Sequence, residues 1–165
     1  MIYPKLSVII PCFNNGNFLS EMMDSVLKQT FNNWELIIVD DKSTDDTSNI
    51  VREFKTRDKR ITLIIREKGP KGSATCRNIG FEYSTGKYVM HLDADDLISD
   101  TCFENRVKFM EHNPEIDYAS FPAMTFTNSK KLPIFSHKGR QYGVGTDNID
   151  LLQKFLKATY PFSTW

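Results

Sequence analysis

The 165-residue sequence has only three cysteines, Cys12, Cys76 and Cys102, which lie far apart with no C-x-x-C pair. This spacing argues against a disulfide framework and a thiolate metal site, and it fits a reducing compartment. Lysine plus arginine equals aspartate plus glutamate, so no excess of charge indicates a nucleic acid as the partner. The sequence after Met1 lacks the pattern of a signal peptide, and no apolar run approaches the ~20 residues that span a bilayer.

Short apolar and β-branched runs alternate with segments whose apolar residues recur at helical spacing. We expect buried strands at 6–10, closed by Pro11, at 34–39, at 60–65 and from Tyr88 onward, with a further strand at 117–121. Strands that alternate with helices predict βαβ units, so we expect an α/β fold with a Rossmann-like, mostly parallel sheet flanked by helices. Later the pattern is weak, apart from strand pieces at 126 and 134–135 and a helix at 146–157.

Helices are indicated by apolar faces and by polar residues that can cap them. The first helix is predicted from one apolar face, formed by Leu19, Met22, Met23, Val26 and Leu27. For the later helices we expect N-terminal caps at Ser43, Ser73 and Asp100, a C-terminal glycine at Gly86, and a buried face that includes Cys76, Ile79 and Tyr83.

The apolar run that starts at Tyr88 stops on three carboxylates, Asp93, Asp95 and Asp96. In an open α/β sheet, ligands bind outside the carboxyl ends of the strands. Carboxylates crowded there repel one another unless a cation lies between them, and Mg²⁺ or Mn²⁺ prefers such oxygens and often holds substrate phosphates too. The sequence therefore indicates a metal-assisted diphosphate site. For an isolated D-x-D, a polar turn that caps the next helix is the alternative.

Two other strand ends carry groups that suit a nucleotide. Phe13 and Asn14 follow the first strand, in a turn that has Gly16 but no G-x-G-x-x-G, so a Rossmann dinucleotide fingerprint is absent. The aromatic ring and the amide suit a flat base better than a pyrophosphate. Asp40 and Asp41 end the second strand, where a carboxylate can accept hydrogen bonds from a base imide or a ribose hydroxyl.

The loop at 66–72, after the third strand, is rich in glycine and positive charge and contains Lys71. Arg77, in the helix that follows, is a candidate for binding phosphate or for pairing with the carboxylates. His91 shares a strand face with Asp93 by the period of two, but we expect a packed histidine rather than a ligand. Right-handed crossovers keep the carboxyl ends of parallel strands on one edge, so these groups should converge there.

Five motifs, taken in order, resemble the family-2 glycosyltransferases with the A-type (nucleotide-diphospho-sugar transferase) fold. They are Ser7–Asn15, Ser25–Thr30, Ile38–Asp45, Ala74–Gly80 and Leu92–Asp96. Their order and spacing match the nucleotide half of that family over residues 5–112. The resemblance implies an inverting transferase that takes its sugar from a nucleotide-diphosphate donor, usually a UDP-sugar, with Mg²⁺ or Mn²⁺.

The resemblance also implies roles for single residues. By this likeness Asp41 holds the base, Asp93 the ribose or the metal, and Asp95 the metal on the diphosphate. The donor ligands expected in all are Pro11, Phe13, Asn14, Asp41, Lys71, Arg77 and Asp93, and the metal ligands are Asp93 and Asp95. Phe13 stands where the family often has Tyr, which keeps the stacking face and loses a hydroxyl. Lys42 stands where the family often has Gly, which gives the turn its backbone freedom.

The family's catalytic base, a downstream carboxylate, and its later Gln/Arg-Trp element have no counterpart before Trp165. We therefore expect residues 1–115 to be the nucleotide-sugar-binding half and 116–165 the incomplete start of the acceptor-side part, with the base beyond Trp165. By family likeness we expect a saccharide or lipid-linked acceptor, such as a bacterial surface polysaccharide. The same likeness indicates work in the cytoplasm, at the inner face of the membrane.

Three other classes of function are considered. A nucleotide-sugar-binding module without catalysis would also explain the absent base. In phosphatases of the haloacid dehalogenase type a D-x-D follows the first strand of the sheet, whereas here it follows the fourth. An EF-hand loop that starts at Asp93 would end on Glu104, but Leu97 takes a ligand position and Ile98 the position of the obligatory glycine.

Overall fold

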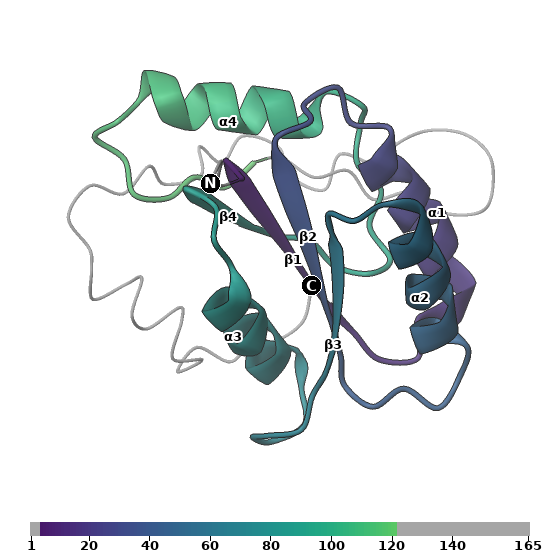
Figure 1. Ribbon diagram of the computed structural model, residues 1–165. Helices are drawn as coiled ribbons and strands as arrows, with labels where there is room; N and C mark the ends of the chain where they lie inside the picture. Colours follow the sequence, from purple (N-terminus) through teal and green to yellow (C-terminus); the bar gives the residue numbers. More distant parts are fainter. Residues whose placement is uncertain (1–3, 122–165) are drawn as a thin grey trace, which may run out of the picture. The chain divides into compact units, whose positions relative to one another are not determined.

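The computed structural model describes residues 4–121 of the chain (Figure 1). Within this range strands and helices alternate, as β1 Leu6–Cys12, α1 Gly16–Leu27, β2 Trp34–Asp40, α2 Thr47–Arg57, β3 Ile61–Ile65, α3 Ser73–Tyr83, β4 Tyr88–His91 and α4 Cys102–His112. The strands form a parallel sheet in the order β3-β2-β1-β4. The predicted α/β class, with a parallel sheet flanked by helices, is confirmed. Residues up to Val107 form one compact unit, and a second unit begins at Lys108.

β1 lies between β2 and β4, and every one of its residues is buried. The sequence predicted that this strand closes at Pro11, but it continues through Pro11 to Cys12. The carbonyl of Ile9 points toward β4, because it accepts a hydrogen bond from the backbone N–H of Leu92. Residues two apart in a strand point to the same side, so the nitrogen of Pro11 also points that way, but beyond the last paired residue of β4. The missing N–H of proline therefore removes no ladder hydrogen bond.

Helices cover both faces of the sheet: α1 and α2 lie over one face and α3 over the other (Figure 1). Alternate residues of β2 serve the two faces, because Ile38 packs in the core with α1 and α2 whereas Ile37 and Val39 pack with Cys76 of α3. Sheets covered on both faces have strands that read as continuous apolar runs, as these do. The apolar face predicted for α1 is confirmed by four fully buried side chains, Leu19, Met22, Met23 and Val26.

The start of α2 differs from the prediction, since Ser43 is not its cap and the helix begins at Thr47. Lys42 has a φ of 61°, in the left-handed region, and after this turn the Ser43 hydroxyl donates to the Asp40 carboxylate at 2.5 Å. Instead, the Asp45 carboxylate accepts from the backbone N–H of Thr47 at 3.0 Å. The first backbone N–H groups of a helix have no partner within the helix, and Asp45 accepts the hydrogen bond of one of them, that of Thr47.

The start and the buried face of α3 also differ from the prediction. Gly72, with a φ of 138°, precedes the helix, and Ser73 is its first residue rather than its cap. Tyr83 was predicted to be buried but is 58% exposed. The helix packs on the sheet through Cys76 and Gly80, and Tyr83 is its last residue, beyond that contact.

Gly86 is not the C-terminal cap of α3, because the chain leaves the helix at Ser84 in an extended conformation. The backbone N–H of Gly86 donates to the hydroxyl of Ser7 at 2.8 Å, and that hydroxyl donates to the carboxylate of Glu35 at 2.6 Å. A Cβ at Gly86 would lie 2.6 Å from the Ser7 oxygen. The glycine is therefore needed for the close approach of this turn to β1.

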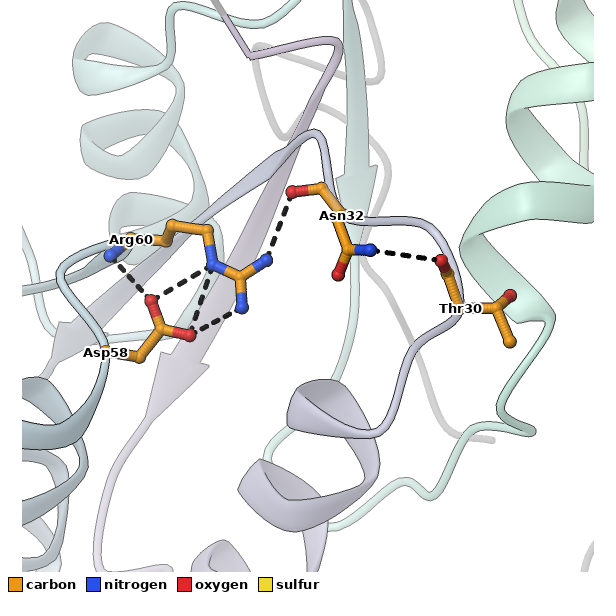
Figure 2. A network of polar contacts seen from close by, with 4 residues as sticks. All are labelled: Thr30, Asn32, Asp58 and Arg60. Carbon is orange, nitrogen blue, oxygen red and sulfur yellow. Dashed lines mark hydrogen bonds and ion pairs between the residues drawn. The ribbon is translucent and has the colours of Figure 1, made fainter.

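A network of polar contacts lies just before the first residue of β2, at the edge of the sheet opposite the carboxyl ends of the strands (Figure 2). Arg60 pairs with Asp58, with 2.5 Å between Nη2 and Oδ2, and its Nη1 donates to the carbonyl of Asn32 at 3.1 Å. The Asn32 side chain in turn donates to the carbonyl of Thr30. The Arg60 guanidinium also lies 3.6 Å from the centroid of the Trp34 ring. These contacts tie the start of β3 to the start of β2.

Several expectations concern the later part of the chain. His91 is exposed rather than packed, because α3 lies over β1 and β2 on that face. α4 begins at Cys102, so Asp100 is not its cap, and the Asp100 carbonyl accepts from the backbone N–H of Thr30 at 2.8 Å. Residues 117–121 form no regular strand, only an isolated bridge at Tyr118. The strand pieces at 126 and 134–135 and the helix at 146–157 lie outside the described residues.

Within residues 4–121, no helix combines the length and the apolar character that crossing a membrane requires.

Candidate functional site

A cavity of about 280 Å³ lies at the carboxyl edge of the sheet. Its lining comes from the end of β1, from the turns after β1, β2 and β4, and from the first turns of α3. It consists of Pro11, Cys12, Phe13, Asn15, Asp41, Ser73, Cys76, Arg77, Asp93, Ala94 and Asp95. This edge is where ligands of open α/β sheets bind. Of the predicted site residues, the lining includes Pro11, Phe13, Asp41, Arg77, Asp93 and Asp95, but not Asn14 or Lys71.

Asn14 joins the loop after β1 to the loop after β2. Its φ of 54° lies in the left-handed region, which asparagine tolerates better than most residues. Its backbone N–H donates to the Ser43 hydroxyl at 2.9 Å, and its Oδ1 accepts from the backbone N–H of Thr44 at 2.8 Å. The amide that the sequence proposed for the base is thus engaged in holding two loops together.

Phe13 presents a partly exposed aromatic ring to the cavity, with 40% of the residue accessible. The backbone N–H of Phe13 donates to Oδ1 of Asn15 at 2.8 Å, which holds the turn after β1. The Nζ atom of Lys71 lies 3.4 Å from the centroid of the ring. Lys71 does not line the cavity, but it makes a cation–π contact with Phe13, which does.

Asp41 is a buried carboxylate, with only 4% of the residue exposed, and both of its oxygens have partners. Oδ1 accepts from Nε of Arg66, and Oδ2 accepts from the backbone N–H of Gly72 at 2.8 Å. A carboxylate offers about four acceptor positions, so each oxygen can still accept one further hydrogen bond. Asp41 can therefore bind a donor group in the cavity while it keeps both partners.

Arg66 is a site residue that the sequence analysis missed. Its Nη1 donates to the carbonyl of Gly69 at 2.8 Å, and its backbone N–H donates to the carbonyl of Asp40 at 2.8 Å. The guanidinium thus ties the loop after β3 to the Asp41 carboxylate. The available signal was an arginine directly after an apolar strand, because arginine is seldom buried without a paired anion.

Asp40 and Asp41 have different surroundings although they are neighbours in the chain. The Asp40 carboxylate accepts from the backbone N–H of Ser43 at 2.9 Å and from the hydroxyls of Ser43 and Ser48. Asp40 does not line the cavity, whereas Asp41 does. Of the two carboxylates that the sequence placed at this strand end, Asp41 is therefore the one available to a ligand.

The acidic end of β4 meets α3 through an ion pair. Nη2 of Arg77 lies 2.6 Å from Oδ1 of Asp93, whose side chain is 53% exposed. Asp95 lines the same cavity and is exposed. Partial desolvation raises the pKa of Asp96, and the charges of Asp93 and Asp95 raise it further. The negative charge predicted from the D-x-D is thus concentrated here and is partly balanced by Arg77.

This arrangement fits a divalent cation that shares its coordination with a substrate. Within residues 4–121, no group of three or more His, Cys, Asp or Glu side chains is gathered closely enough to hold a metal by itself. Mg²⁺ does not need such a cage, because it is usually held by one or two carboxylates together with water and substrate phosphates. Asp93 and Asp95, both at the cavity, supply that donor set.

Two cysteines line the cavity, and neither is suited to act as a nucleophile. Cys12 and Cys76 are buried and free. Burial raises the pKa of the Cys76 thiol to about 11, and burial also raises the pKa of Cys12. A thiol with a raised pKa remains protonated near neutrality, and the thiolate is the reactive form. The cavity therefore offers a ligand carboxylates, a guanidinium and an aromatic ring, but no reactive thiolate.

Comparison with known proteins agrees with this geometry. Residues 7–158 match Glycosyl transferase family 2. A relative in Bacillus subtilis, the minor teichoic acid biosynthesis protein GgaB, is 37% identical over 119 residues, which are 70% of this chain and 13% of GgaB. The chain spans less than half the length of the curated relatives that it matches, for example 15% of one from Rickettsia bellii and 45% of one from Haemophilus influenzae.

Two solved structures share the fold. TarS 1–349 of S. aureus, in complex with UDP-GlcNAc, has a TM-score of 0.67 and 26% identity over 79% of this chain and 37% of its own. The mannosyltransferase PcManGT of Pyrobaculum calidifontis, in complex with GDP-Man and Mn²⁺, has a TM-score of 0.63 and 27% identity over 70% of this chain and 34% of its own. The fold, the cavity and the match over most of the sequence lead to one conclusion: the chain belongs to glycosyl transferase family 2.

Proposed function

We propose that this chain binds the UDP-sugar donor of an inverting glycosyltransferase. The observation that carries the proposal is the meeting, in one cavity, of an exposed aromatic ring, a buried carboxylate and an exposed acidic pair. A nucleotide sugar needs these three things in turn, because its base stacks, its imide N–H donates a hydrogen bond, and its diphosphate shares a cation with carboxylates. UDP-GlcNAc in complex with TarS supports uridine as the base.

The base end of the donor is assigned to Phe13 and Asp41, with Pro11 and Asn14 shaping the turn beside them. Phe13 offers a partly exposed ring, and Asp41 keeps acceptor capacity beside its two partners. Uracil carries one imide N–H between two carbonyls, so a single buried carboxylate suits it. The complex of TarS with UDP-GlcNAc leads us to expect a preference for UDP over GDP.

The phosphate end is assigned to Asp93 and Asp95 together with Arg77. Asp93 and Asp95 would hold Mg²⁺ or Mn²⁺ jointly with the diphosphate, and PcManGT in complex with GDP-Man and Mn²⁺ supports a dication. When bound, such an ion acts as a Lewis acid where negative charge develops on the leaving diphosphate. Arg77 adds a fixed cation on the same side, paired with Asp93 at 2.6 Å.

The acceptor side of the reaction is assigned to chain outside residues 1–115. An inverting displacement needs a base to take the acceptor's proton. Asp40, Asp41 and Asp93 are each held by hydrogen bonds or an ion pair on the donor side. We propose that residues 1–115 are the donor-binding half, that 116–165 begin the acceptor side, and that the base lies outside residues 1–115.

The acceptor of the whole protein is proposed to be a saccharide or a lipid-linked saccharide of a bacterial surface polysaccharide. The printed role of GgaB in teichoic acid biosynthesis supports this class. We propose that the transfer takes place in the cytoplasm at the inner face of the membrane. The free cysteines Cys12, Cys76 and Cys102 are consistent with a reducing compartment.

Calorimetry of the 165-residue chain with UDP, GDP and ADP, in Mn²⁺ and in EDTA, tests the donor assignment. We expect UDP to bind most tightly and to bind more tightly with Mn²⁺. Asp95→Asn, which keeps the shape and removes a charge, should abolish the cation dependence. Equal affinity for UDP in Mn²⁺ and EDTA would refute the metal role, and a preference for GDP would refute uridine.

A matched pair of variants tests the base assignment. Asp41→Ala should weaken UDP binding by roughly ten- to a hundredfold, because losing one partner of a buried hydrogen bond costs ~1–3 kcal/mol. Asp46→Ala, an exposed carboxylate just before α2, should leave the affinity unchanged. The reverse ranking would place the base elsewhere. Binding without turnover in the whole protein would support the alternative, a nucleotide-sugar-binding module.

A further inference from the structure

Two consecutive residues of the loop before α3 contact the two groups assigned to the base. The Nζ atom of Lys71 lies 3.4 Å from the centroid of the Phe13 ring. The backbone N–H of the next residue, Gly72, donates to Oδ2 of Asp41 at 2.8 Å. A base that donates to Asp41 and stacks on the face of Phe13 that this ammonium covers would therefore enter beside Lys71.

The backbone of this loop is fixed, whereas the Lys71 side chain is exposed. Arg66 holds the loop by donating both to Asp41 and to the carbonyl of Gly69. Lys71 itself is exposed, with a flexible four-carbon stem. The ammonium can consequently move by several ångströms while the loop and its contacts with Asp41 stay in place.

The contact of Lys71 with Phe13 is weak enough to be exchanged. A cation–π contact at an exposed site is worth about two- to fivefold in an equilibrium constant. An ammonium bound to a phosphate gains a charge-assisted hydrogen bond, which is roughly twice as strong as a neutral one. A ligand that brings both a base and a diphosphate can therefore displace Lys71 from the ring and offer it a better partner.

We propose that Lys71 is a specificity-determining residue that leaves the Phe13 ring when the donor binds and pairs with its diphosphate. The proposal rests on the donor site described above. A nucleoside without phosphates displaces the ammonium from the ring and offers it no new hydrogen-bond acceptor. A nucleoside diphosphate displaces it and then binds it. Lys71 thus selects for the phosphorylated ligand at the base end of the site, a role separate from that of Asp93 and Asp95.

The test compares uridine with UDP on the 165-residue chain and on Lys71→Ala, which removes both the ammonium and the stem from the ring. We expect Lys71→Ala to bind uridine about two- to fivefold more tightly, because the ring is no longer covered. We expect it to bind UDP about tenfold more weakly, because a charge-assisted hydrogen bond to phosphate is lost. The control is Lys68→Ala, which truncates an exposed lysine in the same loop and should change neither affinity.

Nuclear magnetic resonance of the parent chain gives a second readout that needs no variant. The ε-methylene protons of Lys71 should be shifted upfield by the Phe13 ring and return to ordinary values on saturation with UDP. Signals that stay shifted at saturation would overturn the exchange, as would a Lys71→Ala variant that changes both affinities in the same direction. If UDP does not bind the parent chain, the proposed donor site itself fails. UDP binding without the opposed changes refutes only the role of Lys71.

Discussion

Removal of the Arg66 guanidinium should destabilise the protein strongly, because it leaves the Asp41 carboxylate buried without its cation. The side chains of Arg66 and Asp41 are 11% and 5% exposed. Deleting one partner of such a pair costs ~3–5 kcal/mol, since the remaining charge is desolvated and uncompensated. Asp41 keeps the backbone N–H of Gly72, so we expect Arg66→Met to fall near the lower end, about 3 kcal/mol. For a chain of this size that corresponds to roughly 6–12 °C in Tm.

A double variant and a surface control make this experiment specific. In the double variant Asp41→Asn/Arg66→Met, the unpaired Asp41 carboxylate is also removed. The double variant should therefore be less destabilised than Arg66→Met alone. Arg57→Met removes an equivalent guanidinium from an ion pair with Glu53 whose side chains are 56% and 62% exposed. That control should stay within ~1 kcal/mol of the parent, as exposed ion pairs do.

The assay is urea unfolding followed by far-ultraviolet circular dichroism, with the m-value checked for constancy so that the midpoint shift reports stability. UDP affinity measured on the folded protein should also fall for Arg66→Met, because the loop loses one of its two attachments to the Asp41 carboxylate. If Arg66→Met unfolds at the same urea concentration as Arg57→Met, the Asp41–Arg66 pair is solvated in solution and the reasoning from burial is wrong.

Two further perturbations test the packing and the loop contacts. Gly80→Ala should destabilise the protein by ~1–3 kcal/mol in urea unfolding, because its Cβ would lie 2.4 Å from Cγ2 of Ile9 in the buried strand β1, and an unchanged midpoint would contradict the close packing of α3. Hydrogen bonds from Thr47 and a backbone N–H lower the pKa of Asp45 below its ordinary 3.8, so its stabilisation is complete above that value and is lost as the pH falls through the lowered pKa. Asp45→Asn should therefore lose less stability than the parent on acidification below pH 3.8, and parallel melting-temperature profiles would refute the role of this carboxylate.

The sequence by itself determined the elements and the edge of the sheet at which the site lies. The short, β-branched apolar runs of β1 and β2 are typical of strands buried on both faces, and strands that alternate with helices favour a parallel sheet. The convergence of Phe13, Asp41 and Asp93 at one cavity followed from that topology, because parallel strands end on the same edge. The family likewise followed from motif order, and its match over residues 7–158 confirmed it.

The tertiary structure alone decided which neighbouring residues serve the site and which serve the fold. Asp40 and Asp41 are the same residue type at neighbouring positions, but only the Asp41 carboxylate binds the guanidinium of Arg66, which lies 25 positions later. Gly86 looked like the end of a helix and instead contacts Ser7, 79 positions earlier. The helix caps predicted at Ser43 and Ser73 were also wrong. Turns with positive φ at Lys42 and Gly72, together with tertiary contacts, place the helix starts at Thr47 and Ser73 instead. Local propensity specifies elements, whereas hydrogen bonds between distant segments depend on how those elements pack, and no pattern within one segment encodes them.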